Sequence, residues 1–184
     1  MVETDELVYN RYLTSHNEND IRILLERHKD SLVLFLMGFV HDIDDAEELM
    51  LDAFAEVAAS RKFSGKSSFK TWLFSIGKNK ALMSLRKKRF IFVSEDELPE
   101  SASEDRPETD ILKNERDRQL YKALDGLNKE YRQILLLLFF EEMTPEEAGS
   151  VMGKNRKQIY NLAERGKKAL KEELERMGYE NVQY

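Results

Sequence analysis

The stretch 69–89 constrains the fold more than any other feature, because its spacing predicts one long helix. At about 100° per residue, five apolar side chains fall on or beside one narrow stripe. They are Phe69, Trp72, Leu73, Ile76 and Met83. Ser68 is a suitable N-cap, and four basic residues, 86–89, crowd the last turn, where the helix dipole favours cations. This helix should organise the first part of the chain.

The window 57–94 contains no Asp or Glu, although acids outnumber bases 35 to 29 in the whole chain. Its basic residues are Arg61, Lys62, Lys66, Lys70, Lys78, Lys80 and the run 86–89. Aromatic residues lie among them, including Phe63, Phe74 and Phe90. Phosphates and stacking bases would suit this mixture, so the window favours nucleic-acid binding. The alternative, aromatics in the core and lysines in solvent, fits Phe69 and Trp72 best; for Phe74, which projects among lysines, both interpretations stay open.

Composition narrows the class of protein. Three prolines and eight glycines in 184 residues favour long helices, and the absence of cysteine excludes disulfides and thiolate metal sites. No catalytic constellation occurs, and His16, His28 and His41 share no metal-ligand spacing. We therefore expect no enzyme activity, metal or cofactor. The acidic N-terminus lacks a signal-peptide pattern and the longest apolar run, 134–140, is too short to span a bilayer, so we expect a cytoplasmic protein.

Three further helices are expected before the organising one. Apolar spacing predicts helices over 6–13 and 21–40, and Asp44 to Glu47 resembles a capping box that opens a third. The exposed face of the third helix carries a row of acids. They are Asp45, Glu48, Asp52 and Glu56. Such a row is either a solvated face or a docking surface for a basic partner.

Residues 93–110 differ in composition from their surroundings. They contain eight acids against one arginine, together with Pro99 and Pro107. Few apolar groups are present to offset ordering entropy, so we interpret this stretch as a flexible acidic linker. The predicted fold is all-α, with two small helical domains, 1–92 and 111–184, joined by that linker.

The second domain contains a helix-turn-helix pattern. Its helices should end near Gly126, begin again at 127–128, and begin a third time at a Thr144–Glu147 capping box with Pro145 inside. Four residues then match the motif at offsets 0, 4, 10 and 13: Gly149, Gly153, Ile159 and Leu162.

The second helix of this motif has a polar outer face. Arg156 and Lys157 lie in its first turn, against the dipole, which makes better sense if a phosphate approaches there. Asn161 and Arg165 have hydrogen-bonding groups that can read base edges. The alternative is a helical hairpin whose surface is merely solvated.

These segments resemble a known family. Residues 45–54, 63–73, Asn79 and 85–89 are similar to region 2 of bacterial sigma-70 family RNA polymerase sigma factors of the extracytoplasmic-function (ECF) group. Residues 127–135 and the helix-turn-helix through 165–170 resemble region 4. The sequence departs from the family at Met83, Lys154 and 160–162, which concerns the promoter sequence rather than the class.

The resemblance implies a set of site residues and partners. Contacts with the minus-10 promoter element would come from Lys62, Phe63, Ser64, Lys66, Ser67, Ser68, Lys70, Phe74 and Lys78. Contacts with the minus-35 element would come from Asn155, Arg156, Lys157, Tyr160, Asn161, Arg165 and Lys168. Docking on core RNA polymerase would use Asp45, Glu48, Leu49, Asp52 and Glu56. The polymerase partners would be the clamp helices of the largest subunit and the flap of the second-largest, and an anti-sigma factor is a further partner of many family members.

Two other functions fit parts of the sequence. A stand-alone helix-turn-helix regulator would bind duplex DNA tightly without polymerase, at a palindromic site. A helical adaptor that binds only proteins would leave the acid-free window unexplained.

Overall fold

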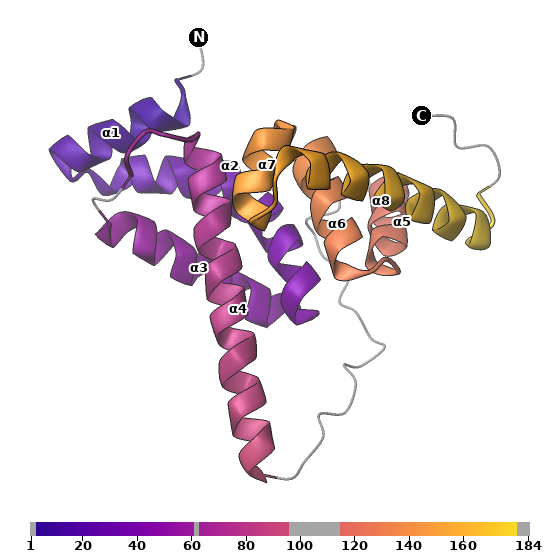
Figure 1. Ribbon diagram of the computed structural model, residues 1–184. Helices are drawn as coiled ribbons and strands as arrows, with labels where there is room; N and C mark the ends of the chain where they lie inside the picture. Colours follow the sequence, from indigo (N-terminus) through magenta and orange to yellow (C-terminus); the bar gives the residue numbers. More distant parts are fainter. Residues whose placement is uncertain (1–2, 61–62, 96–114, 180–184) are drawn as a thin grey trace. The chain divides into compact units, whose positions relative to one another are not determined.

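The computed structural model describes residues 3–60, 63–95 and 115–179, and within these ranges all regular structure is helical (Figure 1). The chain divides into two compact units, Met1–Arg106 and Pro107–Tyr184. Among the described residues, no helix combines the length and the apolar character needed to cross a bilayer.

The first unit contains α1 (Asp5–Ser15), α2 (Glu18–Val40), α3 (Ile43–Ala59) and α4 (Phe69–Glu95). Its core lies where α2, α3 and α4 pack, and includes Leu32, Leu36 and Phe54. Gly77 permits close approach of α4 to α2, since a Cβ there would lie 2.9 Å from Leu32 Cδ1. Burial of such apolar surface is the main force that holds the three helices together.

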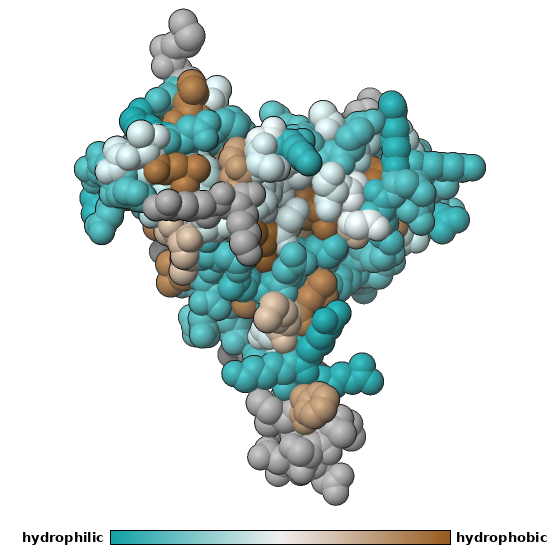
Figure 2. All heavy atoms as spheres, turned by 60° about the vertical axis from the view of Figure 1, so that its left-hand side comes forward, coloured by the Kyte–Doolittle hydropathy of each residue, from teal (hydrophilic) through white to brown (hydrophobic). Residues whose placement is uncertain are grey.

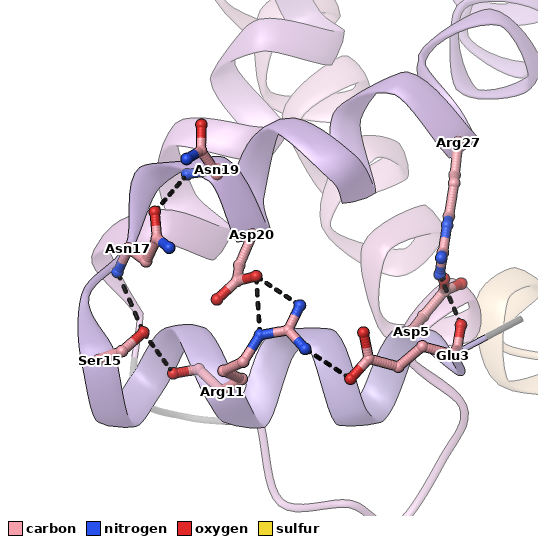
Figure 3. A network of polar contacts seen from close by, with 8 residues as sticks. All are labelled: Glu3, Asp5, Arg11, Ser15, Asn17, Asn19, Asp20 and Arg27. Carbon is pink, nitrogen blue, oxygen red and sulfur yellow. Dashed lines mark hydrogen bonds and ion pairs between the residues drawn. The ribbon is translucent and has the colours of Figure 1, made fainter.

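α1 is fastened to α2 by ion pairs as well as by packing. Arg11 donates to Asp20 Oδ1 from Nε and Nη2, at 2.9 and 2.6 Å (Figure 3). Arg27 Nη1 donates to Asp5 Oδ1 at 2.7 Å, and His28 Nε2 lies 2.6 Å from Asp5 Oδ2. The two helices are therefore joined near both ends of α1.

The ends of α3 and α4 test the capping predictions. Ser68 caps α4 as expected, because its Oγ accepts the N–H of Thr71 at 3.2 Å. The capping box at Asp44 was wrong: the N-cap of α3 is Asp42, whose carboxylate accepts the N–H of Asp45. Asp42 has extended backbone angles and directly follows the left-handed His41 that ends α2, so the new helix begins two residues earlier.

Two residues of the organising helix lie elsewhere than predicted. Phe74 does not project among lysines: it is fully buried, with its ring centroid 5.2 Å from that of Phe35. Met83 is 64 % exposed rather than on a buried stripe. The first half of α4 packs against α1, α2 and α3, which buries more than one stripe, whereas its later turns extend past α3 (Figure 1). α4 also continues to Glu95, into the predicted linker; the rest of 93–110 lies outside the described residues.

The second unit contains α5 (Glu115–Asp125), α6 (Lys129–Leu135), the π-helical turn η1 (Leu136–Phe140), α7 (Pro145–Met152) and α8 (Arg156–Arg176). Asn128 caps α6, and the predicted capping box of Thr144 and Glu147 is present at α7. α8 packs on α6 through a shared core that includes Ile134, Leu135, Ile159 and Ala163. The buried cation Arg132 donates to Asp125 and Tyr121 and so links the middle of α6 to the last turns of α5.

Candidate nucleic-acid interface and docking helix

The loop before α4 presents small polar and basic side chains. Ser64 and Lys66 are exposed, Ser67 and Ser68 are half-buried, and Gly65 takes a positive φ of 68°, which glycine adopts without strain. Phe63 is half-buried, with its ring 5.1 Å from Trp72 and 5.7 Å from Tyr9. The expected contact Lys62 lies outside the described residues.

The lysines of α4 do not form one uniform basic surface. Lys70 and Lys78 are half-buried. Lys80 Nζ lies 2.8 Å from Glu56 Oε2, and Lys88 pairs with Asp45, so α3 neutralises two cations of the acid-free window. Arg86, Lys87 and Arg89 remain exposed, and Figure 2 shows hydrophilic side chains projecting around this lower part of α4.

α3 presents only part of the predicted docking row. Glu48 and Asp52 are exposed and form no ion pair with any described residue. Asp45 and Glu56 are engaged by the lysines of α4. Leu49, the apolar member of the predicted docking set, is a core residue, 7 % exposed, so it offers little surface to a partner.

An apolar side chain that the sequence analysis missed lies beside these acids. Leu51 is 56 % exposed on α3, next to Asp52. The sequence could have revealed it, because Leu51 is an apolar residue on the polar face of the helix, away from the positions predicted to be buried. Leu51 therefore adds apolar contact area to a surface that was predicted from its acidic residues.

The helix-turn-helix is built as its spacing predicts. Gly149 is buried where α7 meets the turn, and a Cβ there would lie 2.6 Å from the carbonyl oxygen of Lys154. Gly153 ends α7 in the left-handed region, with φ 69°. Asn155 then caps α8 by a reciprocal box with Gln158. Ile159 is fully buried and holds α8 against the unit.

The outer face of α8 brings the predicted duplex-reading side chains together. All seven are exposed: Asn155, Arg156, Lys157, Tyr160, Asn161, Arg165 and Lys168. Arg156 donates to the Tyr160 hydroxyl at 3.2 Å and pairs with Glu146 of α7 at 3.1 Å. These partners raise the pKa of Arg156, with the hydrogen bond to Tyr160 the larger cause, so the guanidinium is held charged and oriented at the start of α8.

Taken by fold and site, the protein is an all-helical DNA-binding protein of the helix-turn-helix class. Its first unit combines a basic, aromatic loop with an acidic helix face. Comparison with known families narrows the class. Residues 24–91 match the family model for sigma-70 region 2, and residues 117–170 match the model for sigma-70 region 4. Together the matches cover about two thirds of the chain.

Relatives and solved structures agree. The ECF RNA polymerase sigma factor SigX of Bacillus subtilis is 25 % identical over 168 residues, covering 86 % of this chain and 85 % of SigX. RNA polymerase sigma factor SigV of the same organism is 26 % identical over 148 residues, covering 80 % and 86 %. The fold matches the sigma factor RpoE of Bartonella quintana, solved in complex with the anti-sigma factor NepR, with a TM-score of 0.68, 24 % identity and coverage of 85 % and 97 %.

The chain belongs to the sigma-70 family of RNA polymerase sigma factors, and within it to the ECF group. It is a transcription initiation factor that confers promoter specificity on bacterial RNA polymerase. Recognition of the minus-10 element belongs to its region 2 unit and recognition of the minus-35 element to its region 4 unit.

Proposed function

We propose that three surfaces of this chain divide the work of promoter recognition. The exposed acids Glu48 and Asp52, with Leu51 beside them, dock on the clamp helices of the largest polymerase subunit. Charged groups at a docking surface steer and orient a basic partner more than they add affinity, while Leu51 supplies apolar area. Asp45 and Glu56 are available only if their lysine partners release them.

The loop 63–68 and the first turns of α4 hold the opened minus-10 strand. Half-buried Phe63 supplies an aromatic face beside Trp72, and the polar residues Ser64, Lys66 and Ser67 lie next to it. Bases stack on aromatic rings while lysines contact phosphates, and this combination suits single-stranded DNA. Phe74 has no part in the contact because it is buried.

α8 enters the major groove at the minus-35 element. Lys157 and Arg156 contact phosphates near the helix N-terminus, while Asn161 and Arg165 lie farther along the exposed face and contact base edges. The region 4 unit also docks on the flap of the second-largest subunit. The observation that carries the proposal is that two sigma-70 matches follow one another along the chain. The region 2 match contains the acidic helix and the loop, and the region 4 match contains the exposed, capped start of α8.

An anti-sigma factor is a further proposed partner. RpoE was solved with NepR, and CnrH, which matches this chain at 20 % identity with a TM-score of 0.61, was solved with the cytosolic domain of CnrY. We propose that this protein acts in the cytoplasm, where polymerase and promoter are found, without a cofactor and without enzyme activity of its own.

Run-off transcription tests the function directly. Purified core polymerase and this protein are incubated with a library of promoters, and transcripts are sequenced to locate their starts. We expect new starts, absent with core polymerase alone, that share two sequence elements at a fixed spacing. Transcripts without such shared elements would contradict the proposal.

A further inference from the structure

α1 contacts both borders of the proposed minus-10 loop. The family match begins at residue 24, so α1 lies outside the matched segment. Yet its side chains reach the last turn of α3 on one side of the loop and the first turn of α4 on the other. α1 is itself held on α2 by the Arg11–Asp20 and Arg27–Asp5 ion pairs (Figure 3).

On the α3 side, two tyrosine hydroxyls of α1 donate to carbonyls at the end of α3. Tyr9 Oη lies 2.6 Å from the carbonyl oxygen of Ser60 and 3.0 Å from that of Val57, so its single proton is shared between the two acceptors. Tyr12 Oη donates to the carbonyl of Ala58 at 3.0 Å. The last carbonyls of an α-helix lack their usual partner four residues on, so these hydroxyls, together with the Ser60 N–H on the Val57 carbonyl, hold the end of α3. Burial raises the pKa of Tyr9 to about 12, which keeps its hydroxyl protonated as a donor.

On the α4 side, a carboxylate of α1 satisfies a donor at the helix start. Glu6 Oε1 accepts the N–H of Phe69, the first residue of α4, at 2.8 Å. That N–H is one of the first four of an α-helix, which have no acceptor within the helix. A negative charge at the N-terminus also interacts favourably with the helix dipole.

Between the two borders, the ring of Tyr9 supports the loop itself. Its centroid lies 5.7 Å from Phe63, 5.3 Å from Phe69 and 5.4 Å from Trp72. Tyr9 is fully buried, whereas Phe63 and Trp72 are half-exposed. The buried ring of Tyr9 thus packs beneath an aromatic cluster in which Phe63 and Trp72 are partly exposed to solvent.

We propose that α1 is a positioning element for minus-10 recognition, in which Glu6, Tyr9 and Tyr12 hold the loop 63–68 in the conformation that receives the single strand. This inference rests on the proposed function of the loop. None of the three side chains needs to touch DNA. Their effect comes from preorganisation, since a loop held in its binding conformation loses less entropy when the strand binds.

The test replaces the hydroxyls and keeps the rings. The holoenzyme carrying Tyr9→Phe with Tyr12→Phe is compared with the wild type for binding of a fluorescent single strand, the minus-10 strand of the strongest promoter from the run-off library. We expect about tenfold weaker binding of the single strand. Without the hydroxyls the loop loses hydrogen bonds that hold its binding conformation, so more entropy is lost when the strand binds. Affinity for core polymerase and for a duplex with only the minus-35 element should change less than about twofold.

Glu6 and a control on the same helix sharpen the result. Glu6→Ala should weaken strand binding, whereas Glu6→Gln should restore most of it, because the amide oxygen can still accept the Phe69 N–H. Asn10→Ala changes an exposed side chain of α1 and should leave strand binding unchanged. All measurements are made at a temperature at which circular dichroism shows every variant folded.

The possible results distinguish a failure of this inference from a failure of the proposed function in promoter recognition. If the wild-type holoenzyme initiates at no library promoter, the proposed function fails and the inference fails with it. If the wild type initiates but the tyrosine variant keeps full strand affinity, only the inference is overturned. Equal losses in strand, duplex and polymerase binding would also overturn it, because they would indicate a general structural defect.

Discussion

At the scale of single residues, Lys157 and Arg156 share the first turn of α8 but differ in their surroundings. Lys157 is exposed, whereas Arg156 already pairs with Glu146 and Tyr160. We expect Lys157→Ala to lower the slope of log affinity against log salt by about one unit, as one phosphate contact is lost. Arg156→Ala should lower it less, because Glu146 must give up the arginine when DNA binds. The measurement is anisotropy of a minus-35 duplex with holoenzyme over a salt series.

The matched control for this pair is Lys171→Ala. Lys171 is an exposed lysine of the same helix, farther from the N-terminus, and its Nζ lies 3.8 Å from Glu175. Its removal should leave the salt slope unchanged. An unchanged slope for Lys157→Ala as well would contradict its assignment to a phosphate.

Asp5 makes the stability of the first unit depend on pH. The hydrogen bond from His28, with a smaller contribution from Arg27, lowers the pKa of Asp5 to about 2, against the opposing effect of burial. Because the folded pKa is depressed, the stabilisation is complete above the unfolded value near 3.8 and disappears as the pH falls towards 2. Asp5→Asn should therefore lower the free energy of unfolding at pH 7 by about 1–2 kcal/mol, allowing for partial solvent screening.

Denaturant unfolding at pH 7 and near pH 2.5 measures this effect. The difference between wild type and Asp5→Asn should shrink at the lower pH, where the wild-type carboxylate begins to take up a proton. Glu26→Gln, at an exposed pair with Lys29 on α2, should change stability by less than about 0.5 kcal/mol at either pH. A pH-independent difference for Asp5→Asn would show that ionisation is not its cause.

At the scale of elements, the exposed side of α3 can be tested by charge reversal. Glu48→Lys with Asp52→Lys should abolish holoenzyme assembly on a sizing column, since the reversed charges would repel a basic partner. Both side chains are exposed, so each swap should alter the free energy of unfolding by under about 0.5 kcal/mol. Glu172→Lys with Glu175→Lys makes the same charge change on α8 and should still assemble. Normal assembly by the α3 variant would exclude this face as the docking surface.

The turn between α7 and α8 depends on one missing side chain. In Gly149→Ala the new Cβ would lie 2.6 Å from the backbone oxygen of Lys154, a contact that the turn can relieve only by moving. We expect a loss of about 1–3 kcal/mol in the stability of the second unit and weaker minus-35 binding. Ser150→Ala, on an exposed neighbour, should unfold at nearly the wild-type temperature. Calorimetry would decide the matter, and an unaltered melting temperature for Gly149→Ala would contradict the close packing.

The starts of α4, α7 and α8 and the helix-turn-helix could be predicted because their causes are local. Ser68, Thr144 and Asn155 cap helices with oxygens that reach only three residues along the chain. Phe74 could not be placed, since its burial depends on how many neighbours surround a helix, and periodicity assumes one buried face. The acid at Glu6 was overlooked for the same reason: its partner, Phe69, is 63 residues away.

At the scale of the whole molecule, positive and negative side chains are less well separated in the folded structure than along the sequence. The window 57–94 has no acid of its own, yet α3 supplies Glu56 and Asp45 to two of its lysines. Sequence windows cannot reveal such pairs, because helices from different parts of the chain bring them together. The positive surface available for DNA is thus smaller than the sequence predicted, and the chain as a whole carries a formal charge of −6.

This balance predicts that promoter binding depends on polymerase. With two lysines of the acid-free window paired to α3 and a net charge of −6, the isolated protein should bind promoter duplex with a Kd weaker than about 1 μM at 150 mM salt, in the range of non-specific contacts. The holoenzyme should bind the same duplex at least about a hundredfold more tightly, because core polymerase holds both recognition units on one template and adds contacts of its own. Anisotropy with the protein, core polymerase and holoenzyme in parallel measures all three affinities. Nanomolar binding by the isolated protein to a palindromic site would instead favour a stand-alone helix-turn-helix regulator.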